Sequence, residues 1–219
     1  MVVRARVPET DSGIQGQNVV AEYDRMQRRL RDRGWLETKS VLSHGIDHGH
    51  ALEIGPGPGY LGLDWLSSTT DTRLTGVDIS PDMVALATHN ASASGMQGRA
   101  AYRLGGGQCI PFEDAAFESV FSAGSLHEWD DPPDVLAEIA RVLKAGGSAL
   151  VLDMRRDMAL PLQWFMSASA GSSLMRTGLK SSIAAAYTPG ELRDLVGRSR
   201  LDWSVEATPS GVALFATKV

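Results

Sequence analysis

Short apolar runs alternate with helix-like stretches through the middle of the chain. The apolar runs cover residues 51–54, 74–79, 100–104, 118–123 and 148–153. Ser80, followed by a proline, predicts the start of one helix. Two prolines at 132–133 open a second helix, which runs through Val142 and stops at Gly146 and Gly147. Strands that alternate with helices are typical of a parallel α/β sheet, so we expect an α/β fold.

Three further segments flank this alternating core. Apolar positions three and four residues apart predict an amphipathic helix over 17–33, which ends at Gly34. The segment 154–188 is rich in Met, Ser and Ala and carries many large apolar side chains, which favours an inserted cap over a linker. A helix over 189–196 then precedes two strand-like runs, near 201–207 and 212–217, whose short connection predicts a hairpin.

The length of the chain fits a single domain, because domains commonly hold roughly 100–200 residues and this chain has 219. Within this domain, 1–219, we expect a helical lid over 1–44, a ligand-binding core over 51–153, the cap over 154–188 and a C-terminal helix with its hairpin over 189–219. Hydrophobic residues make up 43% of the chain and charged residues 21%, so the chain can bury a core.

Charge and composition exclude several classes of protein. The net charge of −5 gives no electrostatic reason to expect nucleic acid as a partner. No stretch approaches the ~20 apolar residues of a membrane span. No apolar run follows the basic residues near the start, so we expect a cytoplasmic protein. The single cysteine, Cys109, cannot form an internal disulfide, and no CxxC pair is present to bind zinc.

The strongest local signal is LEIGPGPGYLG at 52–62, where a strand-like run enters Gly55, Gly57 and Gly59. Glycines let a ligand approach the backbone closely, and the N–H groups of the following helix favour a nucleotide-like ligand. Asp78 ends the next strand, where a carboxylate can accept both hydroxyls of a ribose. A nucleoside-bearing cofactor is therefore expected, with a tight turn that binds nothing as the alternative.

The spacing of the glycines distinguishes between the classes of nucleoside-bearing cofactor. Nicotinamide and flavin cofactors favour GxGxxG, whereas this loop has GxGxG with Glu53 two residues ahead of it. At this point the sequence resembles the class I S-adenosylmethionine-dependent methyltransferases, particularly the branch with the ubiquinone and menaquinone C-methyltransferases. Five motifs in family order carry the resemblance: EIGPGPG at 53–59, GVDIS at 76–80, IPFEDAAFESVFS at 110–122, LHEWDDP at 126–132 and EIARVLKAGG at 138–147.

The resemblance implies both a fold and a cofactor. The fold is a Rossmann-like sheet of seven strands, mostly parallel, with an antiparallel last strand, and the cofactor is S-adenosylmethionine. Glu53 and the three loop glycines would surround the methionine and ribose portions of this cofactor. Asp78 would hold the ribose hydroxyls, and Ile79 and Met83 would pack on the adenine.

Five more positions complete the predicted cofactor site. The backbone near Ser122 and Ala123 would face the methionine group, and Tyr23 of the first helix is available to the cofactor or merely packs. The sequence departs from the family at Gly106, where an acidic or amide side chain commonly contacts the adenine amino group. Either backbone groups such as those of Gly107 or the side chain of Gln108 substitute for that contact, or the affinity for the cofactor is weaker than is usual in the family.

Methyl transfer from a sulfonium asks a protein to exclude water, align the acceptor and remove a proton where the acceptor carries one. His127, directly after the fourth strand, is the first candidate for a general base because its ordinary pKa of about 6.5 suits that task. Asp153, at the end of the fifth strand, is the second. The alternatives are that His127 belongs only to the loop structure and that Asp153 caps the segment after it.

The acceptor is expected to be a small apolar or aromatic molecule, because the cap carries methionines together with Trp164 and Phe165. Half of these side chains would only pack the cap onto the sheet. A rival function is that of a homologue that binds S-adenosylmethionine without transferring its methyl group. The net acidity, and the absence of an Asn-Pro-Pro-Tyr type motif after the fourth strand, disfavour a protein or RNA methyltransferase.

A dense histidine group at 44–50 is the remaining candidate for chemistry. It comprises His44, Asp47, His48 and His50. Glycines interrupt this loop, so it does not hold the side chains in the geometry that a metal ion requires. We therefore expect histidines that are exposed to solvent and no bound metal. No pattern in the sequence identifies the atom that accepts the methyl group or the oligomeric state.

Overall fold

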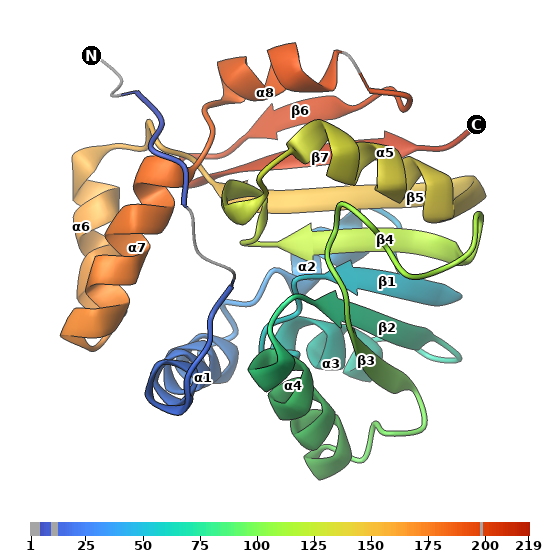
Figure 1. Cartoon of the computed structure of the whole chain (residues 1–219), viewed down its shortest axis with the longest axis horizontal. Coiled ribbons are helices and arrows are strands. Elements are labelled where there is room, and N and C mark those ends of the chain that lie inside the picture. The colour runs from blue at the N-terminus through green and yellow to red at the C-terminus, as the bar shows by residue number, and fades with distance from the viewer. Residues whose placement is uncertain (1–4, 10–12, 198) are drawn as a thin grey trace.

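The computed structural model describes residues 5–9, 13–197 and 199–219. Its centre is a seven-stranded sheet in the order β3-β2-β1-β4-β5-β7-β6 (Figure 1). The strands are β1 (His50–Ile54), β2 (Arg73–Asp78), β3 (Ala100–Leu104), β4 (Phe117–Ala123), β5 (Leu143–Met154), β6 (Ser204–Ala207) and β7 (Gly211–Thr217). Neighbours among β1 to β5 are parallel, and β7 is antiparallel to both β5 and β6. The predicted seven-stranded sheet with an antiparallel last strand is confirmed.

Helices cover both faces of this sheet. One face packs on α2 (Thr38–Ser43), α3 (Tyr60–Ser67) and α4 (Pro81–Ala93), and the other on α5 (Pro132–Val142) and α8 (Pro189–Val196). The strands serve both cores because their side chains alternate between faces. In β5, for example, Val151 packs in the core with α5 and α8, whereas Leu150 and Leu152 pack in the core with α2 and α3. The short helix α2 was not predicted from the sequence.

The connection from α5 to β5 differs from the prediction. The helix ends at Val142 as expected, but β5 begins at the next residue, so Gly146 and Gly147 lie inside a strand and do not stop the helix. The register between β4 and β5 shifts there, between Phe117 and Ser119. A Cβ at Gly147 would lie 2.6 Å from the carbonyl oxygen of Glu118, so the glycine allows the close approach of the two strands.

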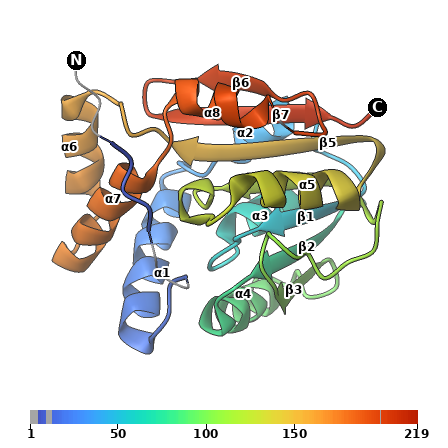
Figure 2. The ribbon, with the colours of Figure 1, turned by 45° about the horizontal axis from the view of Figure 1, so that its top comes forward.

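Four further elements gather at the carboxyl ends of the parallel strands (Figures 1 and 2). They are α1 (Gln17–Asp32), the 3₁₀ helix η1 (Leu126–Glu128), α6 (Leu160–Ser169) and α7 (Ser173–Ala185). The segment predicted as a cap therefore forms two helices. Residues 1–4 and 10–12 of the predicted lid lie outside the described residues.

The first helix is joined to the core by a buried polar contact. The hydroxyl of Tyr60, at the start of α3, donates to Asp24 of α1 at 2.7 Å, and Arg28 pairs with the same carboxylate at 2.7 Å. Asp24 is 8% exposed. This contact ties α1 to the helix that follows the glycine loop.

The order of the strands marks where a ligand would bind. β1 lies between β2 and β4, so the direction in which strands are added reverses at β1, and open α/β sheets bind ligands at the carboxyl ends of the strands at such a point. Across the described residues, we find no helix with the length and apolar character of a membrane span.

Candidate functional site

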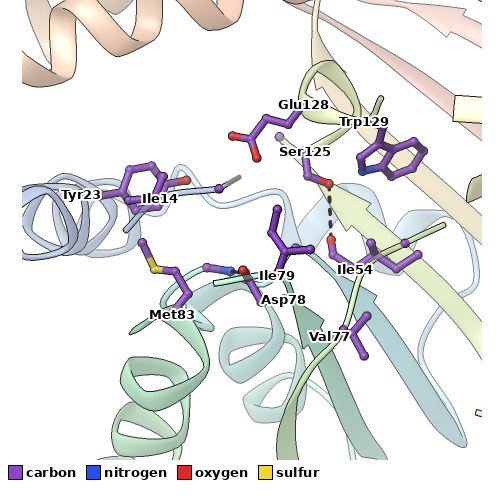
Figure 3. Close-up of a pocket in the computed structure, with 16 residues that line it drawn as sticks. Ile14, Tyr23, Ile54, Val77, Asp78, Ile79, Met83, Ser125, Glu128 and Trp129 are labelled. Carbon is purple, nitrogen blue, oxygen red and sulfur yellow. Dashed lines mark hydrogen bonds between the residues drawn. The ribbon is translucent and has the colours of Figure 1, made fainter. Parts of the chain in front are cut away.

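A cavity that is open to solvent lies at this reversal point (Figure 3). Its walls come from the loop after β1, the end of β2, the start of α4, the loop after β4 and the first helix. Among the residues predicted for the site, those that line it are Tyr23, Gly55, Gly57, Asp78, Ile79, Met83 and Gly107. The structure therefore brings together predicted residues that are up to 84 positions apart in the chain.

The glycine loop adopts backbone angles that favour glycine at all three positions. The φ angles of Gly55, Gly57 and Gly59 are 67°, 52° and 81°, in the left-handed region that side chains with a Cβ rarely adopt. A Cβ at Gly55 would also lie 2.9 Å from that of Ser125, in the loop after β4. Gly59 does not line the cavity. It directly precedes α3, and a Cβ at this position would lie 2.7 Å from the hydroxyl of Tyr102. The loop therefore approaches its neighbours too closely for larger residues.

Asp78 is held rigidly at the edge of the cavity. One carboxylate oxygen accepts the backbone N–H of Gly57 at 3.0 Å, and the other accepts that of Ser80 at 2.9 Å. Burial raises the pKa of Asp78, whereas the two amide hydrogen bonds oppose the rise. Both hydrogen bonds come from backbone N–H groups of the protein, and Asp78 still lines the cavity. This arrangement fixes an acceptor group for hydroxyls of a ligand.

Glu53 lies beneath the loop and does not line the cavity. It is 2% exposed, and a Cβ at Gly62 of α3 would collide with its Oε2 atom. Burial, together with the nearby charge of Asp78, raises the pKa of Glu53 to about 8, against the effect of a hydrogen bond from the backbone of Gly62. The Oε2 atom has no hydrogen-bond partner in the protein. Glu53 is thus a neutral group at pH 7 that supports the loop from below.

The apolar wall of the cavity is built from the start of α4 and from the first helix. Met83 is 2% exposed, Ile79 is 46% exposed, and Tyr23 faces them across the opening (Figure 3). A Cβ at Gly106 would lie 3.5 Å from Ile79, so the glycine leaves open space beside that side chain. Gly107 lines the cavity through its backbone, and the exposed Gln108 does not line it.

The end of β4 supports the cavity from behind. The Ser122 hydroxyl is buried and donates to the carbonyl oxygen of Ile54 at 2.8 Å. Ser122 and Ala123 are not part of the lining, whereas the next two residues, Gly124 and Ser125, are. Ser122 and Ala123 therefore lie directly behind the residues that line the cavity.

His127 and Asp153 form a buried pair beside the cavity. The ring Nδ1 lies 2.9 Å from Asp153 Oδ2 and 3.0 Å from Oδ1, and the backbone N–H of His127 donates to the same carboxylate at 2.8 Å. Burial lowers the pKa of His127, but the charge and hydrogen bond of Asp153 outweigh it and raise this pKa to about 9. The imidazole is therefore protonated at neutral pH.

Two further carboxylates face the other ring nitrogen. His127 Nε2 lies 3.6 Å from Glu9 Oε2 and 3.8 Å from Glu128 Oε1. Burial raises the pKa of Glu128 to about 7, although the positive charge of His127 opposes the rise. Glu128 also lines the cavity, and its carboxylate points into the space between Tyr23 and Ser125 (Figure 3). Glu128 is therefore a titratable group that touches both the cavity and the buried pair.

Sequence reasoning missed several residues of this site. Glu9, Gly13 and Ile14 come from the irregular segment before α1, where no periodic pattern marks a position. By contrast, Glu128 and Trp129 follow His127 directly, and their place after a strand at the carboxyl edge already predicted that they lie near the site.

The histidine group at 44–50 is dispersed over separate partners. His44 Nδ1 lies 2.7 Å from the carbonyl oxygen of Ser40, His48 pairs with Asp47 at 2.9 Å, and His50 Nε2 lies 2.8 Å from the Thr75 hydroxyl. These contacts give each ring a different local role.

Comparisons with known proteins agree with this arrangement. A family model described as a methyltransferase domain matches residues 52–151. The ubiquinone/menaquinone biosynthesis C-methyltransferase UbiE of Geobacter sulfurreducens is 31% identical over 140 residues, which are 62% of this chain and 55% of that protein. The demethylmenaquinone methyltransferase of Deinococcus radiodurans is 26% identical over 70% of this chain and 67% of its own length. The chain spans less than two thirds of the length of the Geobacter and Geotalea relatives that it matches.

Solved structures share the fold. A SAM-dependent methyltransferase from Aquifex aeolicus has a TM-score of 0.67 at 19% identity and covers 90% of this chain and 98% of its own. A putative S-adenosyl-L-methionine-dependent methyltransferase from Methanococcus maripaludis has a TM-score of 0.72 at 17% identity, covering 94% and 98%. The family model, the relatives and the sheet order thus agree. A methyltransferase domain model matches residues 52–151, the chain is similar to ubiquinone/menaquinone C-methyltransferases, and it has the fold of S-adenosylmethionine-dependent methyltransferases.

Proposed function

We propose that this chain transfers the methyl group of S-adenosylmethionine to a small apolar or aromatic acceptor by in-line displacement. The observation that carries the proposal is one cavity with two chemically different sides. Asp78 and the glycine loop form a side suited to a nucleoside, and Glu128 forms a side suited to proton transfer (Figure 3). The His127–Asp153 pair lies beside Glu128.

The residues present fit the cofactor. Asp78 presents a fixed carboxylate, as the ribose hydroxyls require, and the exposed Ile79 with the buried Met83 offers apolar surface next to it for an adenine ring. Backbone groups of Gly107 are the candidates for polar contacts with the adenine edge, since Gly106 has no side chain. When bound, S-adenosylmethionine supplies an electrophilic methyl group on a sulfonium.

The protein's own task is to exclude water and to manage one proton. Tyr23, Ile14 and Trp129 line the cavity and would remove water from the reacting groups. Because the pKa of His127 is raised to about 9, its imidazole is a hydrogen-bond donor at neutral pH and not a base there. Glu128, with a pKa of about 7, is the group that would accept a proton from a hydroxyl acceptor. The positive charge of His127, which Asp153 holds in place, would favour the ionised form of Glu128, whereas the charge of Asp153 itself opposes it.

The class of acceptor is supported by the wall of the cavity and by the relatives. Trp129, Ile54 and Val77 line the cavity with apolar surface. Relatives named for ubiquinone and menaquinone biosynthesis, and for demethylmenaquinone, are consistent with an apolar acceptor. Net acidity favours a small molecule over nucleic acid.

Calorimetry with S-adenosylmethionine and its demethylated product tests the cofactor side. Asp78→Asn should weaken binding by about 1.5–3 kcal/mol, because a charge-assisted acceptor is lost. Asp134→Asn, an exposed carboxylate in the first turn of α5, is the matched control and should leave binding unchanged. No binding by the unmodified protein, or unchanged affinity in Asp78→Asn, would contradict the proposal.

A second measurement separates transfer from binding alone. The purified protein is incubated with cofactor labelled in the methyl group and with a metabolite extract separated by polarity. Label that appears in an apolar fraction supports the proposed acceptor. Tight cofactor binding without label transfer to any fraction would instead favour a homologue that binds S-adenosylmethionine and does not transfer its methyl group.

A further inference from the structure

The outer cap helix α6 is apolar but has no buried residue. Its sequence is LPLQWFMSAS, without a charged side chain, and each of its ten residues is at least partly exposed. Leu160 is 72% exposed and Trp164, one turn later, is 74% exposed. A helix of this composition normally lies in a core, so its exposure indicates a surface that is covered when the protein works.

Neighbouring elements extend this apolar surface. The ring of Trp35, after α1, lies 6.2 Å from that of Phe165, and these two side chains are 49% and 51% exposed. We call Trp35, Leu160, Trp164 and Phe165 the apolar cap face. Together with Leu174, at the start of α7, they are five of the nine large apolar side chains that are exposed among the described residues. Both ribbon views place α6 on the outer side of α7, away from the sheet (Figures 1 and 2).

Positive charge accompanies the apolar cap face. No acidic residue occurs between Met158 and Gly190, whereas Arg176 and Lys180 are exposed on α7. The Arg33 guanidinium lies 5.1 Å from the centre of the Trp35 ring, and Arg29 reaches the α6–α7 turn at Gly171.

The charge is distributed unevenly over the whole chain as well. Residues 17–43 and 154–188 together carry ten basic and five acidic side chains, a net charge of +5, although the chain as a whole carries −5. The remaining residues therefore carry −10. The elements around the apolar cap face are thus basic in an otherwise acidic protein.

We propose that the apolar cap face docks on an anionic lipid surface. Exposed tryptophan, phenylalanine and leucine on a short helix, with basic side chains beside them, match the requirements of a helix that lies in the headgroup region. A second copy of this chain would have to place the same basic elements against each other, which their like charge disfavours. The inference does not depend on methyl transfer, because it concerns a surface and not the cavity.

Vesicle sedimentation with the full chain tests this proposal. We expect binding to phosphatidylcholine vesicles that contain phosphatidylserine, weaker binding to phosphatidylcholine alone, and a decrease as salt is raised. The double variant Leu160→Ser with Trp164→Ser should weaken binding by roughly tenfold or more, through loss of apolar contact. Arg176→Gln with Lys180→Gln should weaken binding to the anionic vesicles by roughly tenfold or more and leave the low binding to phosphatidylcholine unchanged.

Two matched controls distinguish the loss of side chains on or beside the apolar cap face from the loss of similar exposed side chains elsewhere. Leu104→Ser removes an exposed leucine outside the face, and Arg73→Gln with Arg200→Gln removes two exposed charges elsewhere. Neither should change vesicle binding, and unchanged affinity for the demethylated cofactor shows that each variant is folded. Absence of binding to the anionic vesicles, or equal losses in variants and controls, overturns the proposal. So does a dimer, detected by light scattering, that the Leu160→Ser, Trp164→Ser variant dissociates while no vesicle binding is seen.

Discussion

His127 and Glu128 are adjacent in the chain, but their surroundings give them pKa values of about 9 and about 7. Asp153 holds His127 from the protein side through three hydrogen bonds, and this keeps the imidazole charged. Glu128 turns to the cavity and has a pKa of about 7, so it is half ionised where His127 is still protonated. The pH dependence of the reaction can therefore tell the two residues apart.

We predict that the methyl-transfer rate rises with pH through about 7 when the acceptor is a hydroxyl, because Glu128 accepts a proton only when ionised. Glu128→Gln should abolish this limb and lower the rate by roughly 10²–10⁴-fold, with cofactor affinity within a few-fold. His127→Asn should move the limb to higher pH, since the positive charge that lowers the pKa of Glu128 is lost. A limb near pH 9 that disappears in His127→Asn would identify His127 as the base instead.

Glu53 allows a second prediction about a single residue. Its pKa is about 8 in the folded protein and about 4.5 when unfolded, so the folded state binds more protons between these values. Stability contributed by this group is therefore present below pH 4.5 and is lost as pH rises towards 8. As pH rises from 5 to 8, the free energy of unfolding of the unmodified protein should therefore fall by roughly 2 kcal/mol or more relative to that of Glu53→Gln, which has no carboxyl group to ionise.

Chemical denaturation at several pH values measures this effect. Glu113→Gln, at an exposed position, is the control for the loss of one negative charge. Parallel stability curves for Glu53→Gln and the unmodified protein would show that Glu53 is ionised in the folded state despite its burial.

Local patterns at the level of single residues predicted the cofactor side better than the acceptor side. The glycine loop and Asp78 lie within one strand–helix–strand unit, so their spacing along the chain determines where they meet. Glu9 reaches His127 from more than a hundred residues away, through a segment without periodic pattern, and no local rule predicts that contact. The raised pKa of His127 also depends on Asp153 of another strand, so the ordinary pKa of histidine was a poor guide.

At the level of elements, the apolar runs predicted each strand of the sheet. The signal is strongest for β1, β2 and β4, where both faces are buried and the run is nearly continuous. The double glycine at 146–147 predicted a helix stop and instead permits the irregular pairing of β4 with β5. A glycine has no side chain to distinguish these uses, so the backbone of the neighbouring strand decides. The short helix α2 was missed because its six residues span fewer than two turns, too few for a helical period.

The elements over the cavity lead to a prediction about motion. Tyr23 of α1 lines the cavity, whereas Asp24, the next residue, anchors the helix on Tyr60. The α6–α7 pair touches α1 through Ser172, whose hydroxyl donates to Glu22. We expect α1 and the cap to gain protection from hydrogen exchange when cofactor and a substrate analogue bind, because a site that admits substrate must close over it.

Exchange measured by mass spectrometry tests this expectation, with peptides from β6, an edge strand that contributes no residue to the cavity lining, as the internal reference. Removing the hydroxyl with Ser172→Ala should reduce the gain in α6 and α7 more than the gain in α1, because the link between the helices is lost. Full protection of both segments in the free protein would make them fixed parts of the fold.

At the level of the whole molecule, the sheet couples two cores that carry their own fluorescent reporters. Trp65 is buried with α2 and α3, and Trp203 is buried in the core with α5 and α8. Both cores share the central strands, whose alternate residues belong to one core or the other. We therefore expect the two layers to unfold in a single transition.

Cofactor binding should raise the temperature of that transition as a whole. A ligand that binds only the folded state at about 100 times its dissociation constant stabilises it by about 2.7 kcal/mol. For a domain of about 200 residues this corresponds to a rise in melting temperature of roughly 5–10 °C. Circular dichroism and tryptophan fluorescence should report the same shift for the unmodified protein with the demethylated cofactor, and Asp78→Asn should show little of it at the same concentration. In the variant Trp65→Phe four tryptophans remain, and the two buried ones, Trp129 and Trp203, both lie in the core with α5 and α8. A shift seen by circular dichroism but not by the fluorescence of this variant would therefore mean that the cofactor stabilises one layer alone.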